Sequence, residues 1–539
     1  MSGTAVERVR SAYARIAEAD RPELWIGLRP QGEAEAEAAA LDPGLPLYGT
    51  VFAVKGNIDV AGLPTTAGCP SYAYEPGRDA EVVARLRAAG SIVLGTTNLD
   101  QFATGLVGTR SPYGAVRNAI DPAYVSGGSS SGSAVAVALG IADFALGTDT
   151  AGSGRVPAAF NGIVGLKPTY GLVPTEGVVP ACRSIDCVTV FARTLPEARR
   201  AFAVMAPDAL AAPARRPGPW RVAVPSAESL GELDPGWAEA FEGAARGLER
   251  AGAVLLPVDP APFLEAAELL YQGAFVAERY TAVGEFVAKD APDLDPTVAG
   301  IINAAADIPA HRLFADRETL EALRGRAMEA LGDADVLLLP TAPGHPTLAE
   351  VAAEPLAANA RLGRFTNSTN LFGMAALAVP AGTVADRPFG VMLIGPGRSD
   401  DRLAAVASML TPAVRVAVVG AHLTGQPLNH ELTSRGARLV TTTTTAPSYR
   451  LYALPTLPPK PGLVRAAEGG TAVQVEVWEL SAEGLGTFLT GIPRPLGLGR
   501  IELADGSAVT GFVCAPEGLT EATEITSHGG WRAYLATRS

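Results

Sequence analysis

Two serines on glycine-rich turns are the residues of this sequence whose type and setting best suit chemistry. Ser129 lies in the run Ser-Gly-Gly-Ser-Ser-Ser-Gly-Ser, and Ser153 closes a second run, Gly-Thr-Asp-Thr-Ala-Gly-Ser. Between these runs, residues 134–139 carry no polar side chain, which is typical of a short buried helix capped by the preceding serines. A flexible Gly/Ser linker would lack such an apolar segment. We therefore expect the two turns to bring their hydroxyls together.

A nucleophilic serine needs a general base, and the sequence favours a lysine over a histidine. The first of the five histidines is His311, and none lies in a Gly-rich or strand-end setting near the serine turns. The apolar segment 47–54, in contrast, runs directly into Lys55 and a glycine. Burial lowers the pKa of an amine because it penalises the charged form, and a neutral lysine can act as a base. We predict a relay in which Lys55 acts on Ser153 through Ser129.

In such a relay, Ser153 attacks an amide carbonyl, and the oxyanion that forms needs preorganised N–H donors. Four consecutive backbone N–H groups in the second turn are the predicted oxyanion hole, those of Thr150, Ala151, Gly152 and Ser153. The glycine at 152 permits the positive φ that turns successive N–H groups into one concavity. Asp149 and Arg155 flank the nucleophile. An ion pair that holds the loop is favoured over a catalytic role for them, because such pairs are often structural.

These motifs resemble those of the amidase signature hydrolases. Lys55 in Val-Lys-Gly-Asn-Ile-Asp-Val, together with the runs that hold Ser129 and Ser153, matches that family's lysine, bridging serine and nucleophilic serine in order. The resemblance implies an α/β fold with a mixed central sheet flanked by helices, a cis peptide bond before Ser129, and no cofactor or metal. The sequence departs from the family at Ser131 and Ala151, where glycine is more common. These changes bear on substrate choice more than on the chemistry.

Composition narrows the class of protein and its partners. The chain has 539 residues, of which 48% are hydrophobic, enough for more than one domain with a large core. A net charge of −13 argues against nucleic acid and anionic membranes as partners, and an anionic substrate would need a local cation. Four irregularly spaced cysteines form no zinc motif, and we found neither a signal peptide nor a membrane span. We expect a soluble cytoplasmic protein.

The elements expected around these residues divide the chain in two. Strands and helices alternate in residues 1–412, as in an α/β domain; examples are a strand at 25–28, a helix at 79–90 and a strand at 91–95. From residue 413 the pattern changes to successive strand-prone segments separated by Pro- and Gly-rich turns. We therefore predict an amidase signature domain over 1–412 and a smaller, strand-rich α+β domain over 413–539.

Tyr271 and Arg279 are the candidate substrate-binding residues. On one continuous helix, their spacing would make them project within about 80° of each other. A phenol and a guanidinium on one side could clamp a small carboxylate, which the guanidinium would hold in a bidentate fork. The spacing alone favours a plainer interpretation, an exposed helical arginine beside a packed tyrosine.

The C-terminal region carries a second resemblance. Residues 419–430, with the run Val-Gly-Ala-His-Leu-Thr-Gly, and residues 445–455 resemble the C-terminal domain of allophanate hydrolases. In that family the tyrosine and arginine pair corresponds to Tyr271 and Arg279. Allophanate is urea bearing a carboxylate. The resemblance implies that an acyl-enzyme mechanism converts it to ammonia and carbon dioxide and that the C-terminal domain assists the decarboxylation. His422 is the candidate in that domain, and a structural role for it is an equally good interpretation.

Two alternatives from other classes stay open. One is another small-amide amidase, such as a biuret hydrolase or the glutamine-hydrolysing subunit of a tRNA amidotransferase. The other is a non-catalytic relative, which the three intact motif residues disfavour. For partners, the sequence predicts a small-molecule amide, and neither nucleic acid nor membrane. The resemblance adds homodimers and association with other urea- or cyanurate-degrading enzymes as expectations.

Overall fold

The structure is a computed structural model that describes residues 4–207, 218–410, 413–433, 435 and 437–537. Its contacts divide the chain into two compact units, Met1–Leu410 and Thr411–Ser539. Each unit has its own core of buried apolar side chains. The domain boundary that we expect from the sequence, between residues 412 and 413, stays a prediction.

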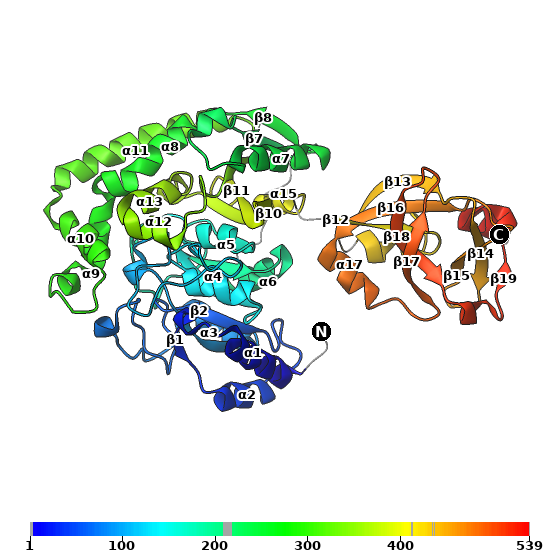
Figure 1. Cartoon of the computed structure of the whole chain (residues 1–539), viewed down its shortest axis with the longest axis horizontal. Helices are drawn as coiled ribbons and strands as arrows, with labels where there is room; N and C mark the ends of the chain where they lie inside the picture. The colour runs from blue at the N-terminus through cyan, green and yellow to red at the C-terminus, as the bar shows by residue number, and fades with distance from the viewer. Residues whose placement is uncertain (1–3, 208–217, 411–412, 434, 436, 538–539) are drawn as a thin grey trace. The chain divides into compact units, whose positions relative to one another are not determined.

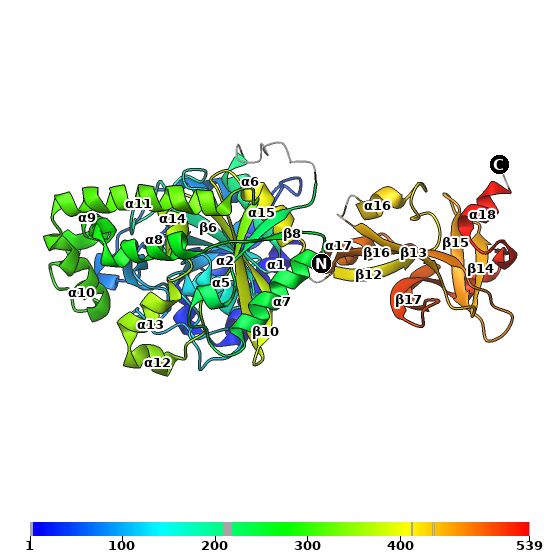
Figure 2. The same cartoon turned by 90° about the horizontal axis from the view of Figure 1, so that it is seen from above.

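A mixed sheet of eleven strands, among the residues described, forms the centre of the larger unit (Figures 1 and 2). The strands in sheet order are β1 (Trp25–Leu28), β3 (Ile92–Thr97), β2 (Val51–Lys55), β4 (Phe144–Asp149), β6 (Cys187–Ala192), β5 (Val164–Lys167), β10 (Ala375–Val384), β11 (Arg387–Gly395), β9 (Val336–Pro340), β7 (Arg221–Val224) and β8 (Val254–Pro257). Parallel pairs lie in the groups β3-β2-β4 and β9-β7-β8, and the other neighbours are antiparallel.

Helices flank this sheet. They are α1 (Ala5–Ala19), α2 (Gln31–Ala39), α3 (Glu81–Ala88), α4 (Ser131–Ala138), α5 (Val156–Phe160), α6 (Leu195–Met205), α7 (Trp237–Arg250), α8 (Ala261–Gln272), α9 (Ala277–Val287), α10 (Pro296–Ala304), α11 (Ala310–Leu331), α12 (Leu348–Ala353), α13 (Pro355–Leu362), α14 (Asn367–Leu371) and α15 (Asp400–Ala407). Helices α8 and α11 run side by side in both views (Figures 1 and 2). The predicted α/β class with a mixed, helix-flanked sheet is confirmed.

The centre of the sheet positions the serine turns. Every residue of β2, β3 and β4 is buried, as expected for parallel strands covered on both faces. Because β2 pairs in parallel with both β3 and β4, the carboxyl ends of the three strands meet at one edge. Lys55, Thr97 and Asp149 are the last residues of these strands. Helix α4, buried from Ser131 to Val137, packs against β4 and is the short buried helix predicted from the apolar run. The predicted serine cap is wrong, because the Ser130 side chain at the N-cap makes no capping hydrogen bond and its hydroxyl bonds the Thr148 carbonyl oxygen at 3.1 Å instead.

The smaller unit is rich in strands, as predicted. A five-stranded sheet in the order β13-β16-β12-β18-β17 and a three-stranded sheet in the order β15-β14-β19 make up its described part. Its strands are β12 (Ala413–Val418), β13 (Arg438–Thr444), β14 (Tyr449–Leu454), β15 (Lys460–Arg465), β16 (Gln474–Ser481), β17 (Leu496–Glu502), β18 (Ala508–Cys514) and β19 (Thr523–Glu524). Its helices are α16 (Asn429–Thr433), α17 (Ala482–Leu489) and α18 (Trp531–Ala536).

Strand β16 differs from its sequence pattern. The alternation of polar and apolar residues in 472–480 indicates a half-buried strand, yet Glu476 is only 2% exposed. This carboxylate accepts hydrogen bonds from Arg532 Nη2 at 2.7 Å, from Thr424 and from the Trp478 indole. Burial is possible because the charge is paired and its lone pairs are used. In the described residues, no helix is both long and apolar enough to cross a membrane.

Candidate active site

Lys55 and Ser129 are in direct contact. Lys55 Nζ lies 2.8 Å from Ser129 Oγ and 2.7 Å from the Thr148 hydroxyl, which β4 supplies beside β2. Both Lys55 and Ser129 are fully buried, and the peptide bond between Gly128 and Ser129 is cis, as the family resemblance implies. The structure thus places the amine out of water and against the bridging hydroxyl.

Burial lowers the pKa of Lys55 to about 7. Desolvation is the largest cause, and the negative charges of Asp100, Asp186 and Asp149 oppose it in that order, while Arg279 adds to the lowering. A substantial fraction of the amine is therefore neutral near neutral pH and can accept a proton.

Ser153 is also buried, with 2% of its surface exposed. Its Oγ lies 3.5 Å from the carbonyl oxygen of Gly105, a residue of the loop after β3. The structure describes both serines and gives no hydrogen bond between the Ser129 and Ser153 hydroxyls. The contact between Lys55 and Ser129 in the predicted relay is therefore formed here, and the contact between Ser129 and Ser153 is not. Catalytic hydrogen bonds of this kind often tighten only when substrate binds.

An ion pair shapes the loop that carries Ser153. The Arg155 guanidinium donates two hydrogen bonds of 2.9 Å to the Asp149 carboxylate, and both side chains are fully buried. Burial alone would raise the pKa of Asp149, but Arg155 holds it below its usual value. The same carboxylate accepts the N–H groups of Gly152 and Gly154, each at 2.9 Å. These contacts agree with the structural role favoured for the pair.

Gly152 in this turn has the positive φ that we predicted, but one of the four predicted oxyanion donors is engaged. Gly152 has a φ of +130°, and a Cβ there would lie 2.4 Å from Thr366 Oγ1. Its N–H donates to Asp149, which leaves Thr150, Ala151 and Ser153 to serve as donors. The Thr150 hydroxyl donates to buried Asp186 at 2.5 Å, which fixes the start of the turn.

Tyr271 and Arg279 lie together, but not for the reason predicted. The prediction of one continuous helix through both residues is wrong, because α8 ends at Gln272 and α9 begins at Ala277. A Cβ at Gly273 would lie 2.5 Å from the Leu269 carbonyl oxygen, so the glycine suits the break between the helices. Arg279 Nη2 nevertheless donates to the Tyr271 hydroxyl at 2.9 Å.

The surroundings of Arg279 exclude an exposed helical arginine. The side chain is 1% exposed, and its Nη1 donates to Thr104 Oγ1 at 2.8 Å and to the Ala103 carbonyl oxygen at 3.2 Å. Its Nε is buried and has no hydrogen-bond partner among the described residues. A buried cation with a free donor is a feature that an anion would satisfy.

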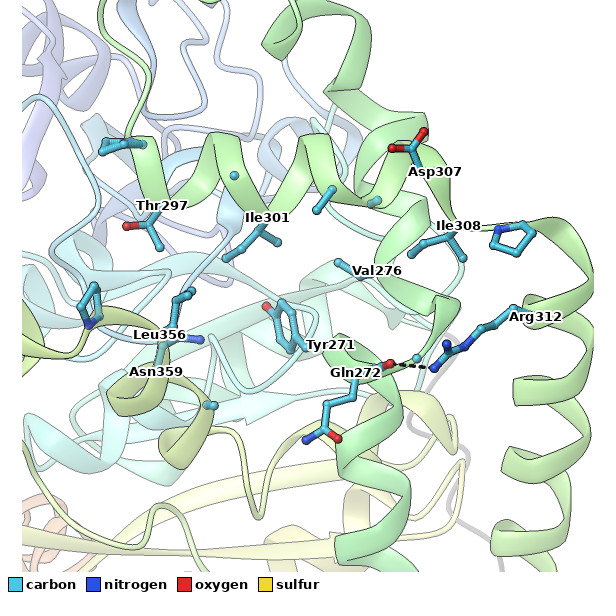
Figure 3. Close-up of a pocket in the computed structure, with 18 residues that line it drawn as sticks. Tyr271, Gln272, Val276, Thr297, Ile301, Asp307, Ile308, Arg312, Leu356 and Asn359 are labelled. Carbon is cyan, nitrogen blue, oxygen red and sulfur yellow. Dashed lines mark hydrogen bonds between the residues drawn. The ribbon is translucent and has the colours of Figure 1, made fainter.

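A cavity of about 910 Å³ adjoins Tyr271 (Figure 3). Its walls come from α8, α10, α11 and α13, and apolar side chains such as Val276, Ile301 and Leu356 face it. Neither Ser153 nor Arg279 lines it. Asn359, also in its wall, accepts the N–H of Leu106 at 2.7 Å, next to the Gly105 carbonyl that faces Ser153. The cavity therefore lies beside the candidate site and shares Tyr271 with it.

In the smaller unit, His422 is held by a carboxylate and two rings. Its Nε2 lies 2.9 Å from Glu431 Oε2, its ring stacks on Phe512, and Phe488 meets it edge-on. Burial lowers the pKa of His422, with Glu431 opposing. His430 is exposed, and its ring Nδ1 lies 2.9 Å from the Pro427 carbonyl oxygen. Among the described residues, no three His, Cys, Asp or Glu side chains are grouped as metal ligands.

Sequence reasoning missed three polar residues that touch the site. Thr148 contacts Lys55, Thr104 contacts Arg279, and Asp186 contacts Thr150. Thr104 lies in Asn-Leu-Asp-Gln-Phe-Ala-Thr-Gly, directly after an apolar strand. A polar residue that closely follows a buried strand is a candidate site residue, so the sequence did carry a signal for Thr104. The pairing of Thr148 with Lys55 depends on strand register, which local pattern does not specify.

Comparison with known proteins identifies the family to which the chain belongs. Residues 7–404 match the amidase family, and residues 414–536 match the allophanate hydrolase C-terminal domain. Urea amidolyases of Lachancea kluyveri and Saccharomyces cerevisiae are 44% and 43% identical over 91% of this chain, which spans only 30% of their length. The structure of Kluyveromyces lactis allophanate hydrolase aligns at 40% identity and a TM-score of 0.70, covering 100% of this chain and 98% of that one. The chain belongs to the amidase family and joins its amidase region to an allophanate hydrolase C-terminal domain.

Proposed function

We propose that this chain hydrolyses allophanate to ammonia and carbon dioxide through an acyl-enzyme on Ser153. The observation that carries the proposal is the buried Arg279, which has a free Nε–H and the Tyr271 hydroxyl beside it, in the same unit as the Lys55 and Ser129 contact. Such a site suits a small amide that also bears a carboxylate. Similarity to allophanate hydrolase and to the urea amidolyases supports the same substrate.

In the proposed reaction, Ser129 relays the Ser153 proton to the neutral Lys55 amine while Ser153 attacks the terminal amide carbonyl. The N–H groups of Thr150, Ala151 and Ser153 stabilise the oxyanion. Ser129 then returns the proton to the leaving nitrogen, and ammonia departs. Water, activated by the same relay, releases the acyl group as a carboxylated carbamate, which breaks down to carbon dioxide and a second ammonia.

An ammonia-release assay with allophanate, biuret, urea and glutamine tests the substrate. We expect kcat/KM to be highest for allophanate, because biuret and urea lack a carboxylate for Arg279 and glutamine carries an additional ammonium group. A preference for biuret or glutamine would replace allophanate with one of the alternative amidase activities. No turnover of any amide, together with no labelling of Ser153 by a serine-directed probe, would indicate a non-catalytic relative.

Substitution of Arg279 by alanine is expected to raise the KM for allophanate by about 10- to 100-fold. This is the loss in affinity expected when one or two charge-assisted hydrogen bonds to the substrate are removed. The KM for a neutral amide such as biuret should change far less, since that substrate has no anion to lose. Steady-state kinetics on both substrates measures the difference. Arg312→Ala is the matched control, because Arg312 lines the neighbouring cavity and, among the described residues, its side chain bonds only the Gln272 carbonyl oxygen, 3.3 Å away. Equal losses on both substrates would count against the clamp.

We further propose that residues 1–412 form the amidase domain and that residues 413–539 assist the second step. Replacing His422 with alanine is expected to leave release of the first ammonia unchanged and to slow carbon dioxide release by about tenfold or more. Parallel time courses of ammonia and carbon dioxide measure the two steps. His430→Ala, an exposed neighbour, is the control. A loss of thermal stability with both products unaffected would leave His422 with only a structural role.

The partners of the chain belong to the same proposal. We propose a small-molecule amide as substrate and a homodimer in solution. We also propose a cytoplasmic location, which the four free cysteines support, because disulfides are rare in that compartment. Association with other urea-degrading activities is suggested by the urea amidolyases, in which the matching region is part of a longer chain.

A further inference from the structure

Asp100 is a buried carboxylate that the proposed mechanism does not use. It follows β3, and its side chain is 0% exposed. Its Oδ2 accepts the backbone N–H groups of Val107 and Gly108 at 3.1 and 3.0 Å, and its Oδ1 accepts that of Arg110 at 3.0 Å. Three hydrogen bonds from one short segment to one carboxylate fix the shape of the loop that contains Gly105.

The same residue also contacts the turn that carries Ser129. The N–H of Asp100 donates to the Ser129 carbonyl oxygen at 3.1 Å. A Cβ added at Gly128 would lie 2.0 Å from Asp100 Oδ2, and one added at Gly105 would lie 2.5 Å from it. The carboxylate therefore fills the space between the two backbones. Since the Gly105 carbonyl faces Ser153, one residue connects the backbone of the bridging serine, through its own N–H, to the loop beside the nucleophile, through its carboxylate.

Asp100 also differs from the other carboxylates that act on Lys55 in the partners that its charge has. Four charged groups act on the amine, Asp100, Asp186, Asp149 and Arg279. Of the three carboxylates, Asp149 is paired with Arg155, and burial raises the pKa of Asp186. Asp100 forms no ion pair among the described residues and binds only uncharged N–H groups. It is also the first of the groups that oppose the effect of burial on the Lys55 pKa.

We propose that Asp100 is a positioning residue for amide hydrolysis: its carboxylate holds the loop that faces Ser153 and packs against Gly128, its backbone N–H holds the Ser129 turn, and its unpaired negative charge lies near the Lys55 amine. That charge stabilises the ammonium ion that forms when the amine takes up the Ser153 proton. The inference rests on the proposed Lys55, Ser129 and Ser153 relay, but it does not depend on which amide is the substrate.

The test removes the charge and keeps the shape, with Asp100→Asn in the full chain. The measurement is the rate at which a fluorophosphonate probe labels Ser153 as a function of pH, alongside ammonia release. We expect labelling at the plateau to fall at least about tenfold, because the amide group offers one acceptor oxygen to N–H groups that used two. We expect the midpoint of the acid limb to move to lower pH by about one unit, because the amine loses its proton more easily without the nearby anion.

Two further variants separate position from charge. Gly105→Ala retains the carboxylate but forces the loop away from it, so labelling should slow while the acid limb stays at its wild-type pH. Asp335→Asn should change neither, although Asp335 is a buried carboxylate that accepts a backbone N–H, that of Arg221, at 2.9 Å. It is not one of the groups with the largest effects on the pKa of Lys55.

Each outcome bears on the inference. An acid limb that stays at its wild-type pH in Asp100→Asn would overturn the role of the charge, and an unchanged plateau would overturn the positioning. If Asp100→Asn does not fold, a wild-type labelling rate in Gly105→Ala would still overturn the positioning role of Asp100. Wild-type protein that is labelled with an acid limb but releases no ammonia from allophanate would refute the proposed function alone.

Discussion

Replacing Ser153 with alanine is expected to reduce ammonia release from allophanate by at least about 10⁴-fold, the scale of loss for serine nucleophiles in other hydrolases. The reason is that no acyl-enzyme can form without the hydroxyl. Ser133 of the first glycine-rich run cannot replace it, since its hydroxyl donates to the Leu146 carbonyl oxygen at 2.8 Å inside the core. The initial rate of ammonia release, with circular dichroism to check the fold, measures the effect.

The control for this variant is Ser131→Ala. Ser131 is buried in the same motif, and its hydroxyl makes only a long 3.5 Å contact with the Asn98 carbonyl oxygen, so activity within a few-fold of wild type is expected. Labelling by a serine-directed probe should be lost in Ser153→Ala and kept in Ser131→Ala. Retention of substantial turnover by Ser153→Ala would refute its assignment as the nucleophile.

The parts of the site that local sequence specifies are those that sequence reasoning predicted best. An apolar strand running into Lys55 indicates a buried amine, and the amine is buried against Ser129. The glycine at 152 indicates a positive φ, and it has one. In both cases a single segment determines the feature. The alternation of strands and helices in the larger unit and the strand-rich C-terminal unit likewise follow from the periodicity of their own segments, whereas the mixed sheet was expected from the family resemblance.

Features that depend on contacts between distant segments could not be predicted in this way. The N–H of Gly152 was expected to face the substrate, but Asp149 accepts it, which depends on how the loop folds back on itself. Tyr271 and Arg279 meet across a break between two helices rather than along one. The role of Asp100 follows from a loop that returns to it, and nothing in its local sequence distinguishes it from a capping residue. These contacts come from the tertiary fold, which periodicity does not encode.

Replacing Lys55 with methionine should have an effect comparable to the loss of Ser153. The relay cannot start without its base, so a decrease in kcat/KM of about 10³-fold or more is expected. Methionine is similar in length and apolar, and it removes an amine that is costly to bury, so the melting temperature should not fall. A loss of activity with stability retained would therefore point to the chemistry. Lys289→Met, at an exposed position, is the control.

The pH profile of the wild-type enzyme provides the second half of this prediction. The base must be neutral to accept a proton, and the pKa of Lys55 is lowered to about 7 by burial. Activity should therefore rise with pH through about 7 and reach a plateau above it. At pH 6 only about one tenth of the amine is neutral, so kcat/KM should be about tenfold below the plateau. Whatever activity remains in Lys55→Met should lack this limb. Residual activity that still titrates near pH 7 would show that another group is the base, and a wild-type profile that is flat from pH 6 to 8 would show that Lys55 is not held at this pKa.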